Sequence, residues 1–352
     1  RHYNIPGQRT LNGDIIHDIC IDKNNNLWIG TEDAGLNKLN MKDHSYTSFN
    51  DMKGLSQNCI HGLASIDNHL WIGTHANGID LMDIRTEKII KHYTISVNPY
   101  ANKNDIIVYL YKLQNNDLLV ATALGVYQYN SQKDIFEQLS QFPNNCRIQT
   151  LFEDHDGVIW AGTSSKGLYY YNPATSQHGE FKLDTVNTSR TINNIYEDRK
   201  NNLWFATGDG IKIYDRSTQQ TTKYDMQDGL PSNVIYRIEE DKKGNMWIST
   251  ANGLARLNPK NHKIKVFKKE HGLTSNQFNY NSSLKTDNDK LYFGTLKGMI
   301  SFQPNSIQEF SIQPKVYISQ INYNDPDHNF LHQEAITFKK GITLEHNQST
   351  FY

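Results

Sequence analysis

Two short motifs contain residue types that could support catalysis or ion binding. Residues 282–285 (Ser-Ser-Leu-Lys) fit the S-x-x-K pattern of serine enzymes, but that pattern opens a helix, whereas the residues around it here alternate like a strand. The segment that starts at Asp154 begins like a calcium loop, but Ser165 stands where a bidentate Glu is required. We therefore expect neither a serine nucleophile nor a calcium site from these motifs.

Histidine and cysteine spacing gives no stronger signal. His328 and His332 are four residues apart, as in a helical zinc site, but no Glu follows the first His and the surrounding residues have strand character. Cys20, Cys59 and Cys146 form no C-x-x-C motif and have no His at ligand spacing, so we expect three small, unbridged, buried apolar residues. The sequence also contains no phosphate-binding loop, nucleophile elbow or cofactor fingerprint. It therefore predicts no catalytic residue, no metal and no cofactor.

The remaining candidates are polar residues suited to recognition. His17 and His61 hold matching positions in two repeats and are expected to face a shared channel as ordinary polar lining. Arg, Asn, Asp and Tyr side chains can hydrogen-bond sugar hydroxyls, bind carboxylates or sulfates, and stack on sugar rings. Residues of these types, together with His and Lys, occur in loops that we expect to converge on one face. The candidate ligand-binding residues are Arg9, His75, Asn77, Tyr100, Arg147, Lys166, Arg190, Asp209, Asn233 and Lys297.

The elements that carry these loops follow from one repeating phrase, which contains all five tryptophans of the chain. An apolar residue precedes Trp, and an apolar or small residue, a small residue and Thr follow it. The Trp position recurs at intervals of 43, 48, 41, 44, 43 and 45 residues, and a fixed period in this range marks a repeat architecture. The copies are residues 27–31, 70–74, 118–122, 159–163, 203–207, 246–250 and 291–295. Seven copies predict an all-β, seven-bladed β-propeller.

Each copy is expected to build one blade of four antiparallel strands. In the first repeat an inner strand over 15–22 leads through the turn 22–25 into the phrase, and the Asp and Asn residues of this turn favour a hairpin. A Gly shortly after the phrase predicts a second turn, followed by a third strand and a weaker outer strand. We expect the small residue before Thr to let an aromatic ring of the neighbouring blade lie close. The tryptophans are then structural rather than platforms for sugars.

The two ends of the repeat array suggest how the ring closes. The seventh repeat has no obvious fourth strand, whereas residues 2–5 stand alone before the first inner strand. We expect residues 2–5 to supply the missing strand, which pairs an otherwise open edge. The propeller is predicted to span residues 1–310. Residues 311–352 alternate like strands without the phrase and are predicted to begin a β-sandwich that is incomplete here, so both ends resemble cuts in a longer protein.

Bulk composition excludes some classes of function. A net charge of −1 and a pI near 7.0 provide no electrostatic argument for nucleic acid or an anionic membrane as a partner. The sequence has no apolar stretch of membrane-spanning length. Recognition of a small polar molecule or of a protein therefore remains.

The repeat Asp-x-x-Gly/Asn-x-Leu-Trp-Ile-Gly-Thr, followed by Gly-Leu, resembles the two-component-regulator propeller repeat. The linking phrases at 53–58, 228–233 and 271–276 are similar to its inter-repeat signature. This repeat is typical of the sensor region of hybrid two-component systems in Bacteroides-type bacteria. The resemblance implies a periplasmic propeller that senses an oligosaccharide released from a complex glycan. It also implies a second propeller, a β-sandwich, a membrane helix, a histidine kinase, a receiver and a DNA-binding module in the full-length protein.

Three functional hypotheses follow. The first is a non-catalytic sensor domain that binds the oligosaccharide, contacts the second propeller and the β-sandwich of the same chain, and signals as a homodimer to the kinase. The second is a propeller lyase or hydrolase that acts on polysaccharide, which requires titratable residues that converge on one face. The third is a scaffold for protein–protein interaction.

Overall fold

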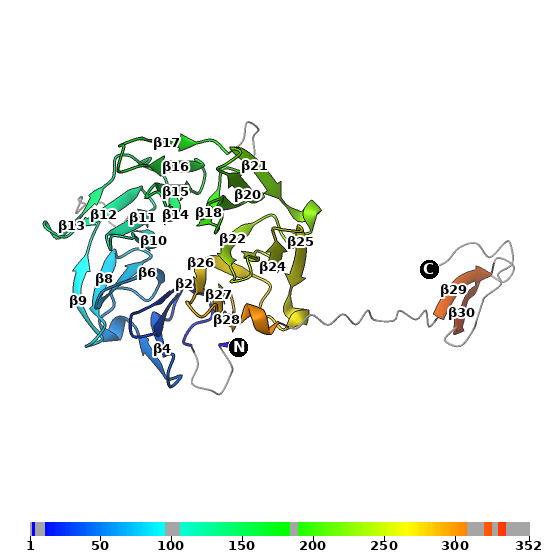
Figure 1. The fold of residues 1–352 in the computed structure, drawn as a ribbon. Coiled ribbons are helices and arrows are strands. Elements are labelled where there is room, and N and C mark those ends of the chain that lie inside the picture. The colour runs from blue at the N-terminus through cyan, green and yellow to red at the C-terminus, as the bar shows by residue number, and fades with distance from the viewer. Residues whose placement is uncertain are drawn as a thin grey trace. The chain divides into compact units, whose positions relative to one another are not determined.

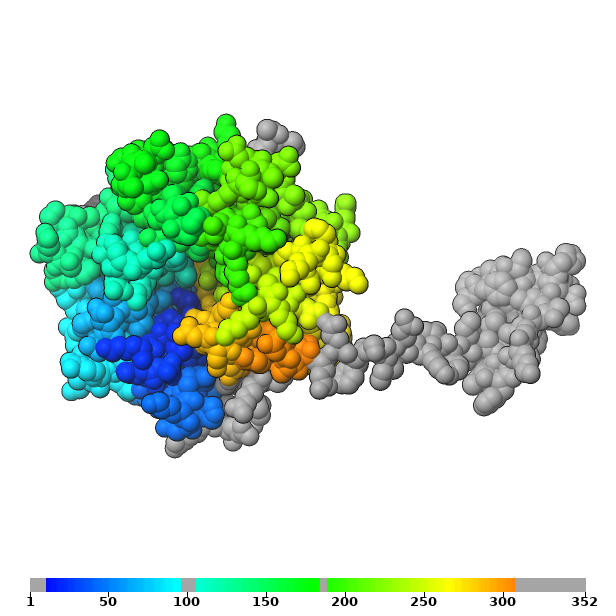
Figure 2. All heavy atoms as spheres, in the orientation of Figure 1, coloured from blue at the N-terminus to red at the C-terminus, as the bar shows by residue number. Residues whose placement is uncertain are grey.

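The computed structural model of the chain describes residues 2–3, 11–95, 106–183, 189–307, 320–325 and 330–335. Seven four-stranded antiparallel sheets form blades around a central axis (Figure 1). The prediction of an all-β, seven-bladed β-propeller is therefore confirmed. In the space-filling view consecutive blades are in contact around the ring, and the first blade (blue) lies beside the last one (orange) (Figure 2).

Six blades consist of four strands that are consecutive in the chain, ordered from the axis outward. The first blade contains β2 (Ile16–Ile21), β3 (Asn26–Thr31), β4 (Leu36–Asn40) and β5 (Tyr46–Phe49). The second contains β6 (Ile60–Ile66), β7 (His69–Thr74), β8 (Ile79–Asp83) and β9 (Lys88–Tyr93). The third contains β10 (Ile107–Lys112), β11 (Leu118–Thr122), β12 (Val126–Asn130) and β13 (Ile135–Gln138). The fourth blade contains β14 (Ile148–Glu153), β15 (Ile159–Thr163), β16 (Leu168–Tyr171) and β17 (His178–Phe181). The fifth contains β18 (Ile192–Glu197), β19 (Leu203–Thr207), β20 (Gly210–Asp215) and β21 (Gln220–Tyr224). The sixth contains β22 (Ile235–Glu240), β23 (Met246–Thr250), β24 (Gly253–Asn258) and β25 (Lys263–Phe267).

The seventh blade joins the two ends of the propeller. It contains β26 (Phe278–Lys285), β27 (Leu291–Thr295) and β28 (Gly298–Phe302), and its outer strand is β1 (His2–Tyr3). In this antiparallel pair His2 lies opposite Ile300 and Tyr3 opposite Met299. The predicted closure of the ring by the amino-terminal strand is confirmed, and it covers the edge that β28 would otherwise expose.

The repeated phrase forms the second strand of each blade, and these strands are almost wholly buried. Four of the five tryptophans donate an indole N–H to an Asp that stands six residues earlier in the turn before the strand. The pairs are Trp28 with Asp22, Trp160 with Asp154, Trp204 with Asp198, and Trp247 with Asp241. The tryptophans therefore belong to the core, and each of these four rings is fixed by its own turn.

The small residue of the phrase accommodates the neighbouring blade, but not in the expected way. A Cβ placed on Gly30 would lie 2.8 Å from Cγ2 of Ile60, and one on Gly73 would lie 2.5 Å from Cγ2 of Ile107. Both isoleucines begin the inner strand of the following blade. The expectation of an aromatic ring at these contacts is wrong, because β-branched aliphatic side chains occupy them.

The chain divides into two compact units, residues 1–306 and 307–352. Within the second unit the described residues form one antiparallel pair, β29 (Gln320–Asp325) with β30 (Phe330–Ala335). Most of the segment predicted to begin a β-sandwich, 311–352, lies outside the described residues, as does His328. No helix in the described part of the chain has the length and apolar character needed to cross a membrane.

Candidate functional site

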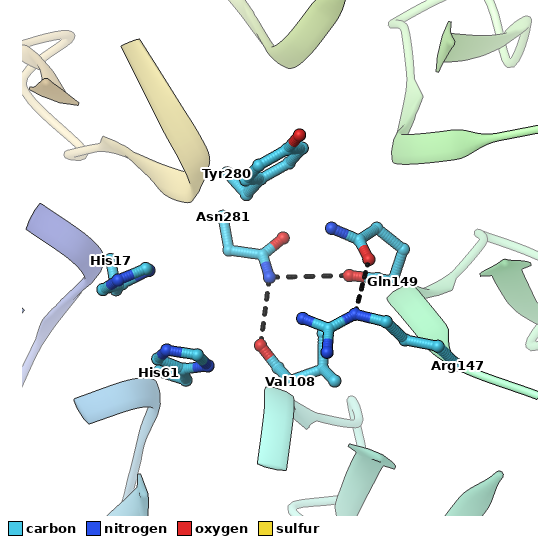
Figure 3. Close-up of a pocket in the computed structure, with 7 residues that line it drawn as sticks. All are labelled: His17, His61, Val108, Arg147, Gln149, Tyr280 and Asn281. Carbon is cyan, nitrogen blue, oxygen red and sulfur yellow. Dashed lines mark hydrogen bonds between the residues drawn. The ribbon is translucent and has the colours of Figure 1, made fainter. Parts of the chain in front are cut away.

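A cavity of about 220 Å³ lies among the inner strands of the propeller (Figure 3). Two histidines lie on one side of it, an Arg and a Gln on the opposite side, and a Tyr and an Asn between them (Figure 3). The lining residues are His17, His61, Val108, Arg147, Gln149, Tyr280 and Asn281. The cavity is therefore lined by five blades, and it offers one permanent cation and several neutral hydrogen-bonding groups.

Irregular pairing in the inner strands brings these side chains together. In β2, Ile16 lies opposite Thr31 and Asp18 opposite Gly30, so His17 is an extra residue without a partner. The same shift of register leaves out His61 in β6, Val108 in β10 and Gln149 in β14. Such bulges bend a strand and redirect the side chain of the extra residue. The bulges at the start of β2, β6, β10 and β14 thus each supply one side chain to the cavity.

The seventh blade contributes more because its bulge is longer. Between Phe278 and Ser283 the register of β26 shifts, and this segment carries Tyr280 and Asn281. Asn281 has a φ of 54°, in the left-handed region that Asn tolerates better than most residues. Its amide donates to the carbonyl oxygens of Val108 (3.1 Å) and Gln149 (3.5 Å), which joins three blades across the axis (Figure 3). The side-chain oxygen of Asn281 is buried and has no hydrogen-bond partner in the part of the chain that the structure describes, so it is available to accept a hydrogen bond from a ligand.

Arg147 is the cation of the cavity. It immediately precedes β14, and its Nε donates to Oε1 of Gln149 at 3.3 Å. Burial lowers the pKa of Arg147 from its ordinary value, but a guanidinium keeps its charge in proteins. Much of the planar donor set of Arg147 is therefore available for a carboxylate, a sulfate or sugar hydroxyls.

The histidines on the opposite side are packed ring against ring. The ring centroids of His17 and His61 are 4.3 Å apart, and those of His61 and His75 are 4.7 Å apart. Burial, together with the neighbouring His17 and His75, lowers the pKa of His61 to about 3. Burial also lowers the pKa of His17, in spite of its hydrogen bond with Glu32. His17 and His61 are therefore neutral near pH 7, so they add hydrogen-bonding groups to the cavity without adding positive charge.

One cysteine lies beside this histidine cluster. Cys59 is half-buried, and its Sγ lies 3.4 Å from Nε2 of His61. Burial, reinforced by Glu32, raises the pKa of the Cys59 thiol to about 12. The expectation that no His lies at ligand spacing from a cysteine is wrong for Cys59, because the bulge in β6 turns His61 toward the loop that carries Cys59. All three cysteines are free, but only Cys146 is fully buried, so the expectation of three buried residues is wrong for Cys20 and Cys59.

The loop residues predicted to bind ligand have different surroundings. Arg147 lines the cavity, and His75 contacts the ring of His61. Four others occupy equivalent positions in the turn after the phrase, where the backbone N–H donates to the Thr hydroxyl: Asn77, Lys166, Asp209 and Lys297. Of the remaining candidates, Arg190 pairs with Glu180, and Oδ1 of Asn233 accepts from the backbone N–H of Met226. Arg9 and Tyr100 lie outside the described residues.

A second set of buried charged groups, outside the cavity lining, is satisfied within the protein. The backbone N–H groups of Ile19 and Leu63 donate to Asp18, and burial raises the pKa of Asp18 to about 7. Nε of Arg237 donates to Oγ of Ser283, which in turn donates to Glu239 at 2.6 Å. A perturbed carboxyl group in a cleft is a usual sign of catalysis. These groups are almost fully buried and have their own partners, which favours a structural role.

Four segments of the chain match a known repeat family. The family model described as "Two component regulator propeller" matches residues 10–33, 141–165, 188–209 and 229–252. These segments lie in the first, fourth, fifth and sixth blades. Each contains the inner strand of its blade and the Trp-containing strand that follows.

Full-length comparisons agree with this match. Histidine kinase P4 of Formosa agariphila is 28% identical over 410 residues, which cover 97% of this chain and 26% of that protein. The extracellular domain of the putative hybrid two component system BT3049 from B. thetaiotaomicron has a TM-score of 0.79 and 24% identity, covering 100% of this chain and 47% of that one. Virginiamycin B lyase from Staphylococcus aureus has a TM-score of 0.66 and 16% identity, covering 86% of this chain and 97% of the lyase.

The two solved structures show a shared fold, and the chain spans about a quarter of the curated kinase. The family model matches four of the seven copies of the phrase, so this chain carries repeats similar to those of the two-component regulator propeller family.

Proposed function

We propose that this chain is a non-catalytic, periplasmic sensor domain of a hybrid two-component system, which binds a glycan-derived oligosaccharide and signals to a histidine kinase. The observation that carries the proposal is the cavity in which Arg147 faces two neutral histidines across a polar space. Similarity to a histidine kinase and to the extracellular domain of a two component system supports the sensor role.

The lining of the cavity suits an acidic sugar. Arg147 provides a planar set of donors for a carboxylate or sulfate, and the free side-chain oxygen of Asn281 provides an acceptor for a sugar hydroxyl. Tyr280 is 39% exposed and forms an edge contact with Tyr236, at a ring separation of 4.6 Å, so part of its surface is available to a sugar ring. An oligosaccharide that carries a uronate or a sulfate therefore fits better than a neutral one.

The same lining argues against hydrolysis. Glycoside hydrolases of the usual type need two carboxyl groups that flank the scissile bond. None of the described residues that line the cavity is Asp or Glu. The alternative enzyme function that the cavity supports is a lyase, because its histidine and tyrosine side chains can transfer protons.

Signalling would use other parts of the full-length protein. The second propeller, the β-sandwich that residues 311–352 would begin, and a second copy of the chain are the proposed partners. A ligand shifts such an assembly only if it binds one arrangement of the paired chains more tightly than the other.

The test is a binding and turnover experiment on the full sensor region. Oligosaccharides that carry uronates, sulfates or neither are titrated by calorimetry, and each mixture is then incubated and analysed by chromatography. Binding of an acidic oligosaccharide without product supports the sensor. New unsaturated or shortened products would identify a lyase or hydrolase, and absence of binding across all three classes would leave the scaffold hypothesis.

A further inference from the structure

Four side chains at the junction between the first and second blades bring metal-ligating atoms close together. Glu32 directly follows β3, Cys59 directly precedes β6, His61 lies in β6, and His75 directly follows β7. Ligand atoms of Cys59, His61 and His75 lie within 4.8 Å of one another, and so do those of His17, Glu32 and His61. His61 belongs to both groups, and its Nε2 is the atom that Cys59 and Glu32 both approach.

The separations suit a tetrahedral zinc site. Zinc–nitrogen bonds of about 2.0 Å and zinc–sulfur bonds of about 2.3 Å place neighbouring donor atoms about 3.3 to 3.6 Å apart. Sγ of Cys59 lies 3.4 Å from Nε2 of His61, and Oε2 of Glu32 lies 4.0 Å from the same nitrogen. The Glu32 side chain is 46% exposed, so its carboxylate has room to rotate toward the other donors.

One of these ligands also has an unsatisfied buried atom. Nδ1 of His75 is buried and has no hydrogen-bond partner among the described residues. Buried polar atoms are nearly always paired, so an exception calls for a partner that the protein itself does not supply. A metal ion bound between His75 and Cys59 would be such a partner.

His17 hydrogen-bonds the Glu32 carboxylate and is not one of the proposed metal ligands. The side-chain amide of Asn279 lies 3.4 Å from Nδ1 of His17, which favours the tautomer with its proton on Nε2. That nitrogen faces Oε2 of Glu32 and donates to it. Second-shell partners of this kind orient the ligands of metal sites. Arg147 lies across the cavity, and its charge is opposed by the carboxylate and by the thiolate that a bound metal would create.

We propose that Glu32, Cys59, His61 and His75 bind a zinc ion that connects the first blade to the second. The mixed set of one sulfur, two imidazole nitrogens and one carboxylate oxygen is typical of the ligands zinc takes in proteins. The site departs from the prediction of no metal. Glu32, Cys59 and His75 do not line the cavity, whereas His61 belongs to both the cavity and the proposed zinc site.

The test uses the full chain freed of metal by a chelator and then dialysed. Zinc titration by calorimetry is expected to show one equivalent bound, and cobalt is expected to give the intense visible bands of a tetrahedral site with a sulfur-to-cobalt charge-transfer band. Cys59→Ser removes the charge-transfer band, and His75→Ala weakens zinc binding at least about tenfold. Cys146→Ser and His155→Ala are the matched controls, and both are expected to leave binding and spectrum unchanged.

Folding is checked separately. The thermal unfolding midpoint of wild type is expected to rise with zinc, since a ligand that binds only the folded state stabilises it, whereas Cys59→Ser responds little. The unfolding midpoint of each variant is compared with that of wild type in the absence of metal, so that a misfolded variant is recognised. If His75→Ala misfolds, His75→Gln replaces it. Octahedral cobalt spectra, or zinc affinity that Cys59→Ser and His75→Ala both leave unchanged, would overturn the proposal.

Discussion

The indole Nε1 of Trp247 donates a hydrogen bond of 3.0 Å to Oδ2 of Asp241, six residues earlier in the chain. The other carboxylate oxygen of Asp241 accepts from the backbone N–H groups of Lys243 and Asn245 in the same turn. One carboxylate therefore closes the hairpin and fixes the largest side chain of the strand that follows. The same arrangement recurs at Asp22, Asp154 and Asp198. The Asp and Trp of the repeat are a structural unit.

Replacing this carboxylate should be costly. Asp241→Ala leaves a buried indole N–H and two turn amides without their acceptor, and each unsatisfied buried group costs about 1–3 kcal/mol. We expect the free energy of unfolding to fall by about 3 kcal/mol, measured by chemical denaturation. Asp43→Ala, in an exposed turn, is the control and should change it far less. Equal effects of the two substitutions would show that the indole contact contributes nothing.

The same residue predicts a pH dependence. Burial alone would raise the pKa of Asp241, but hydrogen bonds from Asn245 and Trp247 outweigh it, so the folded-state pKa lies below the ordinary value of 3.8. A depressed pKa means that the carboxylate stabilises the fold fully above about pH 4, and that this contribution is lost as the pH falls through the folded-state pKa. Denaturation of wild type and Asp241→Asn at decreasing pH from 7 should give curves that approach each other below about pH 4. Parallel curves would contradict this prediction.

The junctions between blades predict a steric effect. Gly73→Ala places a methyl group against Cγ2 of Ile107, and overpacking of this kind costs about 1–3 kcal/mol. Gly179→Ala is the matched control, because the nearest atom to its new Cβ would be 3.9 Å away, on the ring of Tyr170. The double variant Gly73→Ala, Ile107→Ala should show coupling, with a smaller loss than the sum of the single variants. Additive losses in denaturation experiments would place the strain elsewhere.

Local patterns in the sequence were sufficient to predict the fold. The phrase predicted strands at 27–31 and 246–250, and they are observed at Asn26–Thr31 and Met246–Thr250. These strands are buried on both faces, so their apolar character is continuous and easily recognised. Outer strands such as β17 (His178–Phe181) are harder to predict, because their exposed residues provide little apolar signal.

The candidate site was harder to predict because it depends on register between strands. Gln149 and Tyr280 enter the cavity only because the inner strands bulge at their first residues, and a bulge has no clear sequence signature. The matching positions of His17 and His61 were the one available signal, and the two side chains do share the cavity. Exposed loop residues such as Lys166 were selected by residue type alone, and their backbone groups are used by the turns.

Closure by the amino-terminal strand predicts the effect of a deletion. Removing residues 1–3 exposes the edge of β28, which can then pair with another chain. We expect a lower thermal unfolding midpoint and concentration-dependent association in size-exclusion chromatography. Deletion of residues 307–352 is the control, because it leaves all seven blades complete. A truncated protein that remains monomeric with an unchanged midpoint would show that the last blade is stable without its outer strand.

Arg147 predicts how the cavity discriminates between ligands. Arg147→Ala removes a charged hydrogen-bond donor worth about 1.5–3 kcal/mol, so affinity for an acidic oligosaccharide should fall by about ten- to a hundredfold. Arg147→Lys should be intermediate, since an ammonium keeps the charge but loses the planar donor pair. Arg190→Ala is the control, because Arg190 is exposed and paired with Glu180. Calorimetry at two salt concentrations measures these effects, and equal losses for Arg147→Ala and Arg190→Ala would place the sugar on the outer loops instead of in the cavity.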